Sequence, residues 1–127
     1  MTKVETGFPR SARLLTGAEF KRVFAARRVE SNRYFRIHWA GRTELDQDPA
    51  RCSSAGARLG LAIAKRIARR AVDRNRIRRI ARETFRRNRH LLGPVDFVLL
   101  AKPPAVEADS RTLKLALEQL WLRFESP

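Results

Sequence analysis

A run of arginines at residues 65–89 holds the side chains best suited to bind an anion. It reads KRIARRAVDRNRIRRIARETFRRNR and contains 12 Lys and Arg against 2 Asp and Glu, a net charge of +10. Guanidinium groups pair with phosphate oxygens through parallel hydrogen bonds and also stack on planar bases. The segment therefore predicts a surface for a polyanion, and nucleic acid fits it better than an anionic membrane or an acidic protein.

The rest of the chain is much less charged. All 127 residues carry 28 Lys and Arg against 13 Asp and Glu, a net charge of +15, so the 102 residues outside the run contribute only +5. Arginine supplies 23 of the 28 basic residues. Charge concentrated on one element indicates a binding surface, whereas an even spread would fit general solubility.

Helical periodicity divides the run into two sides at about 100° per residue. One side is apolar and is predicted to pack on a sheet, whereas the other is a row of basic residues that can follow successive phosphates. A solvated amphipathic helix with surplus arginine is the simpler alternative, but only Glu83 interrupts the row and such helices normally alternate charge signs. The apolar side comprises Ile77, Ile80, Ala81, Thr84 and Phe85, and the basic side Asn75, Arg79, Arg82, Arg86 and Arg89.

Asn75, the first residue of this row, stands between Arg74 and Arg76 in the sequence. Asparagine is a poor residue for a helix interior, but its side chain both donates and accepts hydrogen bonds. Its amide can therefore hydrogen-bond to a sugar hydroxyl, a base edge or a bound water, whereas a charged side chain would not distinguish these groups.

The elements around the run predict a single domain over residues 1–127. A capping box at Thr16 and Glu19 starts a short helix that reaches about residue 26. Alternation over residues 34–39 predicts a strand, with Phe35, Ile37 and Trp39 on one face and Tyr34, Arg36 and His38 on the other. A shorter strand near residues 27–31 is a further possibility.

The second half of the chain continues this pattern. Residues 41–57 hold Gly, Pro and Ser without periodicity, which predicts a mobile loop. Leu59, Leu61 and Ile63 indicate a strand, and the apolar run of residues 95–101 a central strand. Asp109 or Ser110 caps a last helix with an apolar stripe. The fold class is α/β or α+β, a two-layer sandwich of helices on a small mixed sheet.

No protein active site is expected. His38 and His90 fall on separate elements, and Glu44, Asp46 and Asp48 fall in the loop, where nothing would orient a metal. Cys52 is the only cysteine and is interpreted as a plain loop residue. Because the chain has neither a long apolar stretch nor an apolar secretion signal near its start, we expect a soluble protein of the cytoplasm.

The segment AKRIARRAVDRNRIRRIARETFR resembles the signature of the bacterial ribonuclease P protein component, which centres on an RNR triplet. The resemblance continues through RLLTGAEFKRVF before it and VDFVLLAKPP after it, so it covers nearly the whole chain apart from the loop. It implies a small basic subunit that joins a catalytic RNA and helps to remove the 5′ leader from precursor tRNA. The RNA would perform the hydrolysis and hold most of the Mg²⁺, and neither a membrane nor DNA would be a partner.

The resemblance also implies a fold and two groups of site residues. The fold is an αβββαβα sandwich with a left-handed crossover, where sequence rules alone favour a right-handed one. The group that binds the RNA subunit comprises Lys65, Arg66, Arg70, Arg74, Asn75, Arg76, Arg78, Arg79 and Arg82, and the basic row adds Arg86. The group that lines a cleft for the leader comprises Phe20, Phe24, Tyr34, Arg36 and His38.

Alternatives remain open at two levels. Phe20 and Phe24 lie with Val23 on one helical stripe, so they fit a hydrophobic core as well as a cleft. A structural RNA-binding protein of ribosomal type would share the basic helix without any role in cleavage. An autonomous basic nuclease and a DNA-binding protein are weaker alternatives, the latter because a DNA-reading helix would carry more Asn, Gln and Ser.

Overall fold

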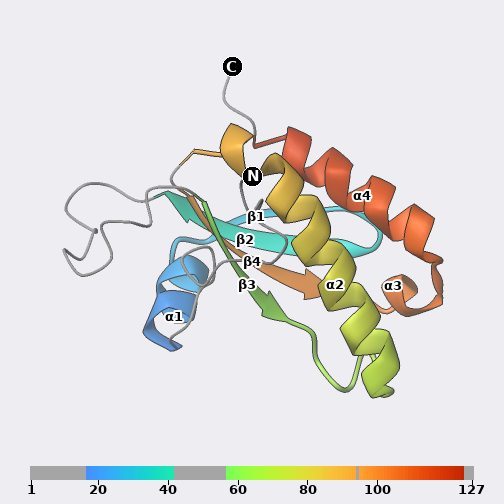
Figure 1. Ribbon diagram of the computed structural model, residues 1–127. Helices are drawn as coiled ribbons and strands as arrows, with labels where there is room; N and C mark the ends of the chain where they lie inside the picture. The colour runs from blue at the N-terminus through green and yellow to red at the C-terminus, as the bar shows by residue number, and fades with distance from the viewer. Residues whose placement is uncertain (1–16, 42–56, 94, 125–127) are drawn as a thin grey trace, which may run out of the picture.

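The computed structural model describes residues 17–41, 57–93 and 95–124, which form helices packed on one sheet (Figure 1). The helix α1 (Gly17–Ala25) is followed by strands β1 (Arg28–Ser31), β2 (Phe35–Gly41) and β3 (Arg58–Ala62). Then come helix α2 (Ala71–Asn88), the 3₁₀ turn η4 (Arg89–Leu91), strand β4 (Val95–Ala101), and helices α3 (Pro104–Glu107) and α4 (Ser110–Leu122).

The expected order of elements is confirmed, with three differences in detail. The basic segment is helical only from Ala71, and α3 and η4 were not expected. Of the two predicted caps of α4, Asp109 is confirmed, because its carboxylate accepts a hydrogen bond from the amide of Thr112 at 2.8 Å. The Thr16 cap and all but the ends of the loop at residues 41–57 lie outside the described residues.

The sheet has four strands in the order β1-β2-β4-β3. The pairs β1/β2 and β2/β4 are antiparallel, whereas β3 and β4 are parallel. A parallel pair needs a crossover connection, and α2 provides it. The mixed sheet and its helical layer are those expected of the α+β class, and the hand of the crossover stays a prediction from the resemblance.

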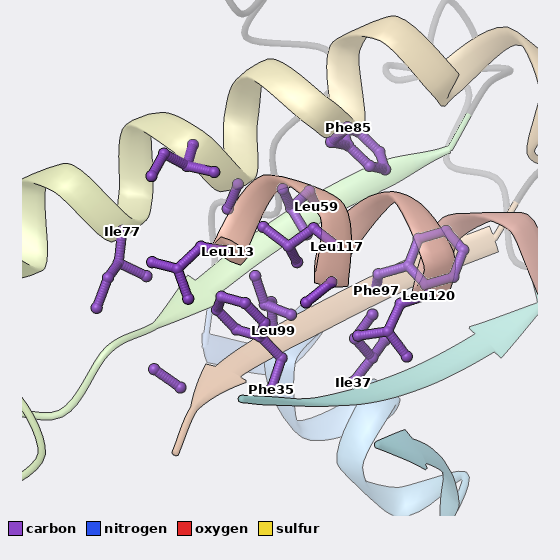
Figure 2. Packing of buried hydrophobic residues seen from close by; sticks show 14 of the residues in the cluster. Phe35, Ile37, Leu59, Ile77, Phe85, Phe97, Leu99, Leu113, Leu117 and Leu120 are labelled. Carbon is purple, nitrogen blue, oxygen red and sulfur yellow. The ribbon is translucent and has the colours of Figure 1, made fainter. Parts of the chain in front are cut away.

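The main hydrophobic core lies between the sheet and the helices α2 and α4 (Figures 1 and 2). The residues of α2 that it buries are the five assigned to the apolar side from periodicity. Phe35 and Ile37 of β2 enter the same core. In the middle of the core, the indole N–H of Trp121 donates a hydrogen bond to the hydroxyl of Thr84 at 3.0 Å, which joins α4 to α2. This packing fixes which side of α2 faces outward.

The opposite face of the sheet is covered by α1 (Figure 1). Its apolar contacts are few: Val23 of α1 packs on Ala40 and Val98, with Phe20, Ala62 and Leu100 around them. Arg36 and His38 belong to this face, because they alternate along β2 with the core residues Phe35 and Ile37. The helices on the two faces of the sheet therefore leave two separate surfaces, one on α2 and one beside α1.

Candidate nucleic-acid interface

The outward side of α2 presents the predicted row of basic residues. Asn75 and Arg79 are exposed, whereas Arg82 and Arg86 are half-buried and make contacts within the chain. Arg78 is also half-buried. The row therefore exists as a surface feature, and its exposure is greatest in the first half of the helix.

The turn that precedes α2 adds further charge. Lys65, Arg66 and Arg70 are exposed there. The turn is shaped by Arg74, whose Nη1 donates hydrogen bonds to the carbonyl oxygens of Ala68 and Arg69, both at 2.9 Å. Arg74 thus holds basic residues of the turn against the first turn of the helix.

Arg76, on the other side of Asn75, is held by the C-terminal part of the chain. Its Nη2 donates to the carbonyl oxygen of Val106 at 3.1 Å, and its Nη1 lies 3.4 Å from the hydroxyl of Ser110. The two arginines of the RNR triplet therefore have structural contacts, while Asn75 between them is exposed. The resemblance placed all three in one binding group and did not reveal this division.

Arg89 marks the far end of the row. Its Nε donates to the carbonyl oxygen of Ala57 at 2.8 Å, just before β3, and burial lowers the pKa of its guanidinium below the usual value. This arginine serves to join η4 to the start of β3, so the row available to a ligand ends near Arg86.

A second cluster of predicted residues lies beside α1. The ring of Phe24 meets the imidazole of His38 edge to face, with centroids 4.8 Å apart. Phe24 is 38% exposed, Arg36 is exposed, and Phe20 is half-buried in the small apolar cluster. Burial, and then the charge of Arg36, lower the pKa of His38. Four of the five residues assigned to the leader cleft therefore share one side of the sheet.

Tyr34 is the exception, and its predicted place on the face of Arg36 and His38 is wrong. The strand β2 begins one residue later, and Tyr34 packs against the main core cluster. There the guanidinium of Arg33 lies 5.8 Å from the centre of its ring. Tyr34 lines a different hollow of about 370 Å³, which also involves Arg33, Pro103, Pro104, Glu107 and Ala108.

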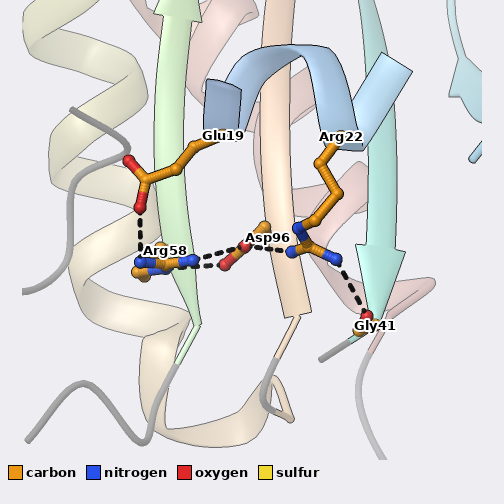
Figure 3. A network of polar contacts seen from close by, with 5 residues as sticks. All are labelled: Glu19, Arg22, Gly41, Arg58 and Asp96. Atoms are coloured by element: carbon orange, nitrogen blue, oxygen red, sulfur yellow. Dashed lines mark hydrogen bonds and ion pairs between the residues drawn. The ribbon is translucent and has the colours of Figure 1, made fainter. Parts of the chain in front are cut away.

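A network of ion pairs joins α1 to the sheet (Figure 3). Arg58 of β3 makes a bidentate contact with the buried carboxylate of Asp96 on β4, from Nε at 2.8 Å and Nη2 at 2.7 Å. Its Nη1 reaches Glu19 of α1 at 2.9 Å. Arg22 of α1 pairs with the same Asp96 and lies 3.5 Å from the carbonyl oxygen of Gly41. Residues so far apart in the chain carry no sequence signal of their pairing.

The acidic side chains of the interface do not fit a metal site. Within residues 17–41, 57–93 and 95–124, no three His, Cys, Asp or Glu side chains gather as metal ligands. Glu19 and Asp96 are engaged by arginines.

None of the helices in the same ranges is long and apolar enough to cross a membrane.

Comparison with known proteins agrees with the resemblance in the sequence. The family described as Ribonuclease P matches residues 8–125. The ribonuclease P protein component of Thioalkalivibrio sulfidiphilus is 44% identical over 124 residues, which cover 98% of this chain and 95% of that protein. The protein of the same name from Photorhabdus laumondii is 42% identical over 120 residues, covering 94% and 92%.

Solved structures share the fold. The RNase P protein of Staphylococcus aureus superposes with a TM-score of 0.74 at 23% identity, covering 88% of this chain and 94% of that one. The RNase P protein of Thermotoga maritima, solved with 1-(4-fluorophenyl)-2-thiourea, gives a TM-score of 0.73 at 24% identity, covering 89% and 100%. With the match along nearly its whole length and the helix that carries the RNR triplet, the chain belongs to the ribonuclease P protein component family.

Proposed function

We propose that this chain is the protein subunit of a ribonuclease P, and that it binds the catalytic RNA through α2 and the 5′ leader of precursor tRNA beside α1. The observation that carries the proposal is the basic surface of α2, which the main core turns outward, in a chain of this family. The two activities are assigned to opposite faces of the sheet.

The RNA subunit is assigned to α2 and the turn before it. The helix exposes Arg79 and the turn before it exposes Lys65, Arg66 and Arg70, so both present donors to a ligand. Bringing these charges together is unfavourable in the free protein, and phosphates relieve the repulsion. Exposed Asn75 adds a group that can read a 2′-hydroxyl or a base edge beside the phosphate contacts.

The leader is assigned to the surface beside α1. Phe24 and His38 present rings on which unpaired bases can stack, and Arg36 supplies a nearby charge for a phosphate. Stacking on aromatic rings accepts any base, which suits leaders of different sequence. Phe20 is half-buried, packs against the cluster of Val23, Ala40 and Val98, and supports this surface.

The hydrolysis itself is assigned to the RNA. The described histidines do not meet to form an acid and base pair, since His38 packs on Phe24 and His90 lies in η4. The buried carboxylates are occupied by arginines, so the Mg²⁺ of the holoenzyme would be held mainly by RNA. The protein contributes charge neutralisation and substrate positioning.

Affinity for a series of tRNAs tests the proposal. Complexes of the RNA subunit with and without this protein are titrated with mature tRNA and with precursors whose leaders grow by one nucleotide. The protein should strengthen binding of precursors and leave mature tRNA nearly unchanged. A protein that strengthens both equally would be a structural RNA-binding protein without a leader site.

A further inference from the structure

Helix α1 depends on its contacts with the sheet for its position. It has nine residues, and helices shorter than about 12 residues are marginal in water by themselves. Its buried apolar contact is centred on Val23, with Phe20 packed beside it, and the ring of Phe24 meets His38 at the surface. The polar attachment is ionic, through Glu19 and Arg22, which lie one turn apart.

The ionic attachment reaches two different strands. Arg58 on β3 holds Glu19, and Asp96 on β4 holds Arg22, while Arg58 and Asp96 hold each other (Figure 3). Asp96 is fully buried, the side chains of Arg58 and Glu19 are only 9% and 10% exposed, and that of Arg22 is 35% exposed. The pairs among Arg58, Asp96 and Glu19 have little access to water, so salt screens them weakly, and Arg22 adds a charge-assisted contact from the edge of the network.

Phe20 and Phe24 lie on the same helix, so the position of α1 sets the positions of both rings. Phe20 directly follows Glu19, and Phe24 meets His38 across the gap to β2. A rotation of α1 about its axis or a slide along the sheet would change the distance between these rings and Arg36 or His38. The position of α1 therefore decides whether the rings form one stacking surface with β2.

We infer that Glu19, Arg22, Arg58 and Asp96 are positioning residues for the leader, and that their network sets the stacking surface by fixing α1 on the sheet. The inference rests on the proposed function, because it assigns a purpose to α1 only if the leader binds beside it. The four residues act through Phe20 and Phe24 rather than by touching RNA. The network is also neutral, with two carboxylates and two guanidiniums, so it places no net negative charge beside the leader.

The test uses the full chain with Glu19→Gln and Arg22→Gln together. The double variant keeps the net charge of the protein and leaves the buried pair of Arg58 and Asp96 intact, so no buried charge loses its only partner. The matched control is Glu30→Gln with Arg123→Gln. It is also neutral overall and breaks an exposed ion pair of 2.9 Å between β1 and the end of α4, away from α1.

Three quantities are measured in the holoenzyme assembled with the RNA subunit: affinity for the subunit, the ratio of precursor to mature tRNA affinity, and amide hydrogen exchange in α1. The double variant should lower the ratio about fivefold or more, the loss of one stacked base. Its affinity for the subunit should stay within about twofold, since α2 is distant. Exchange in α1 should accelerate, and the control should match wild type in all three.

An unchanged ratio in the double variant would overturn the inference, whether or not α1 exchanges faster. The wild-type measurement separates this result from failure of the proposed function. If the wild-type protein shows no preference for precursor over mature tRNA, the proposed leader site itself is refuted. If the double variant does not fold, Arg22→Gln and Arg22→Lys replace it. The lysine variant restores a charge beside Asp96 and should recover part of the preference for precursor tRNA. Equal ratios of precursor to mature tRNA affinity in the glutamine and lysine variants would contradict a positioning role.

Discussion

Nη2 of Arg76 donates a hydrogen bond to the carbonyl oxygen of Val106 at 3.1 Å, which ties the first turns of the basic helix α2 to α3. Arg79, one turn later, is exposed. Two arginines that look equivalent in the sequence therefore differ in what they do. One helps to hold the helix in place, and the other is available to a ligand.

Arg79→Ala should weaken binding to the RNA subunit without lowering the stability of the protein. The dependence of log affinity on log salt should flatten by about 0.7–0.9 for each phosphate that the variant no longer neutralises. Arg76→Ala should in addition lower the free energy of unfolding, by about 1 kcal/mol, because it removes a hydrogen bond. Salt titrations of binding and urea unfolding of both variants check this. An Arg79 variant with an unchanged salt slope would show that this side chain does not meet phosphate.

Phe24→Ala should reduce affinity for precursor tRNA and leave mature tRNA unaffected. The ring is 38% exposed and lies against His38, so its removal costs little packing but takes away a stacking platform worth about 1–3 kcal/mol per base. The measurement is the ratio of the two affinities in the holoenzyme. Phe20→Ala is the comparison, and because Phe20 is half-buried it should also lower the melting temperature. An equal loss for both tRNAs in the Phe24 variant would remove this residue from the leader surface.

Periodicity predicted the inner side of α2 correctly because the hydrophobic core buries every apolar residue on that side of the helix. Ile77, Ile80 and Phe85 recur at helical spacing, and any helix with that spacing must bury them together. The resemblance placed Arg74 and Arg76 in the binding group, but spacing cannot tell that Arg74 bonds to a carbonyl group of the preceding turn and Arg76 to one of α3. The first acceptor lies in irregular backbone and the second is 30 residues away in the sequence, so neither contact has a periodic signal.

The side of the sheet that faces α1 was predicted less well. Alternation assigned Tyr34 to the face of Arg36 because the start of the strand was placed one residue too early, and side chains alternate only within a strand. The pairing of Arg58 with Asp96 depends on the parallel register of β3 and β4, which brings these two residues opposite each other. A sequence without structure does not specify that register.

Thr84→Val should destabilise the protein although it replaces one buried side chain by another of the same shape. The hydroxyl of Thr84 accepts the indole N–H of Trp121 at 3.0 Å, and the valine would leave that buried donor without this acceptor. The expected cost is about 1–3 kcal/mol in the free energy of unfolding. Urea unfolding measures it, with Thr84→Ser as the control that keeps the hydroxyl. Equal stability of valine and wild type would mean that the indole finds another acceptor.

The stability of the protein should fall below about pH 6.5 in part through His38. Its pKa is lowered in the folded state by burial and by Arg36, so the unfolded chain binds the proton more readily. The contribution of His38 is therefore complete above the unfolded pKa and is lost as the pH falls through the folded pKa. Urea unfolding of wild type and His38→Gln from about pH 7.5 to about pH 5 tests this. Parallel pH profiles for the two proteins would contradict it.

Reconstitution of cleavage tests the central claim most directly. Precursor tRNA is incubated with the RNA subunit alone, with this protein alone, and with both, at a physiological concentration of Mg²⁺. Removal of the 5′ leader should be slow with RNA alone, absent with protein alone, and strongly accelerated with both. No acceleration by the protein, or a specific cut by the protein without RNA, would contradict the proposed function.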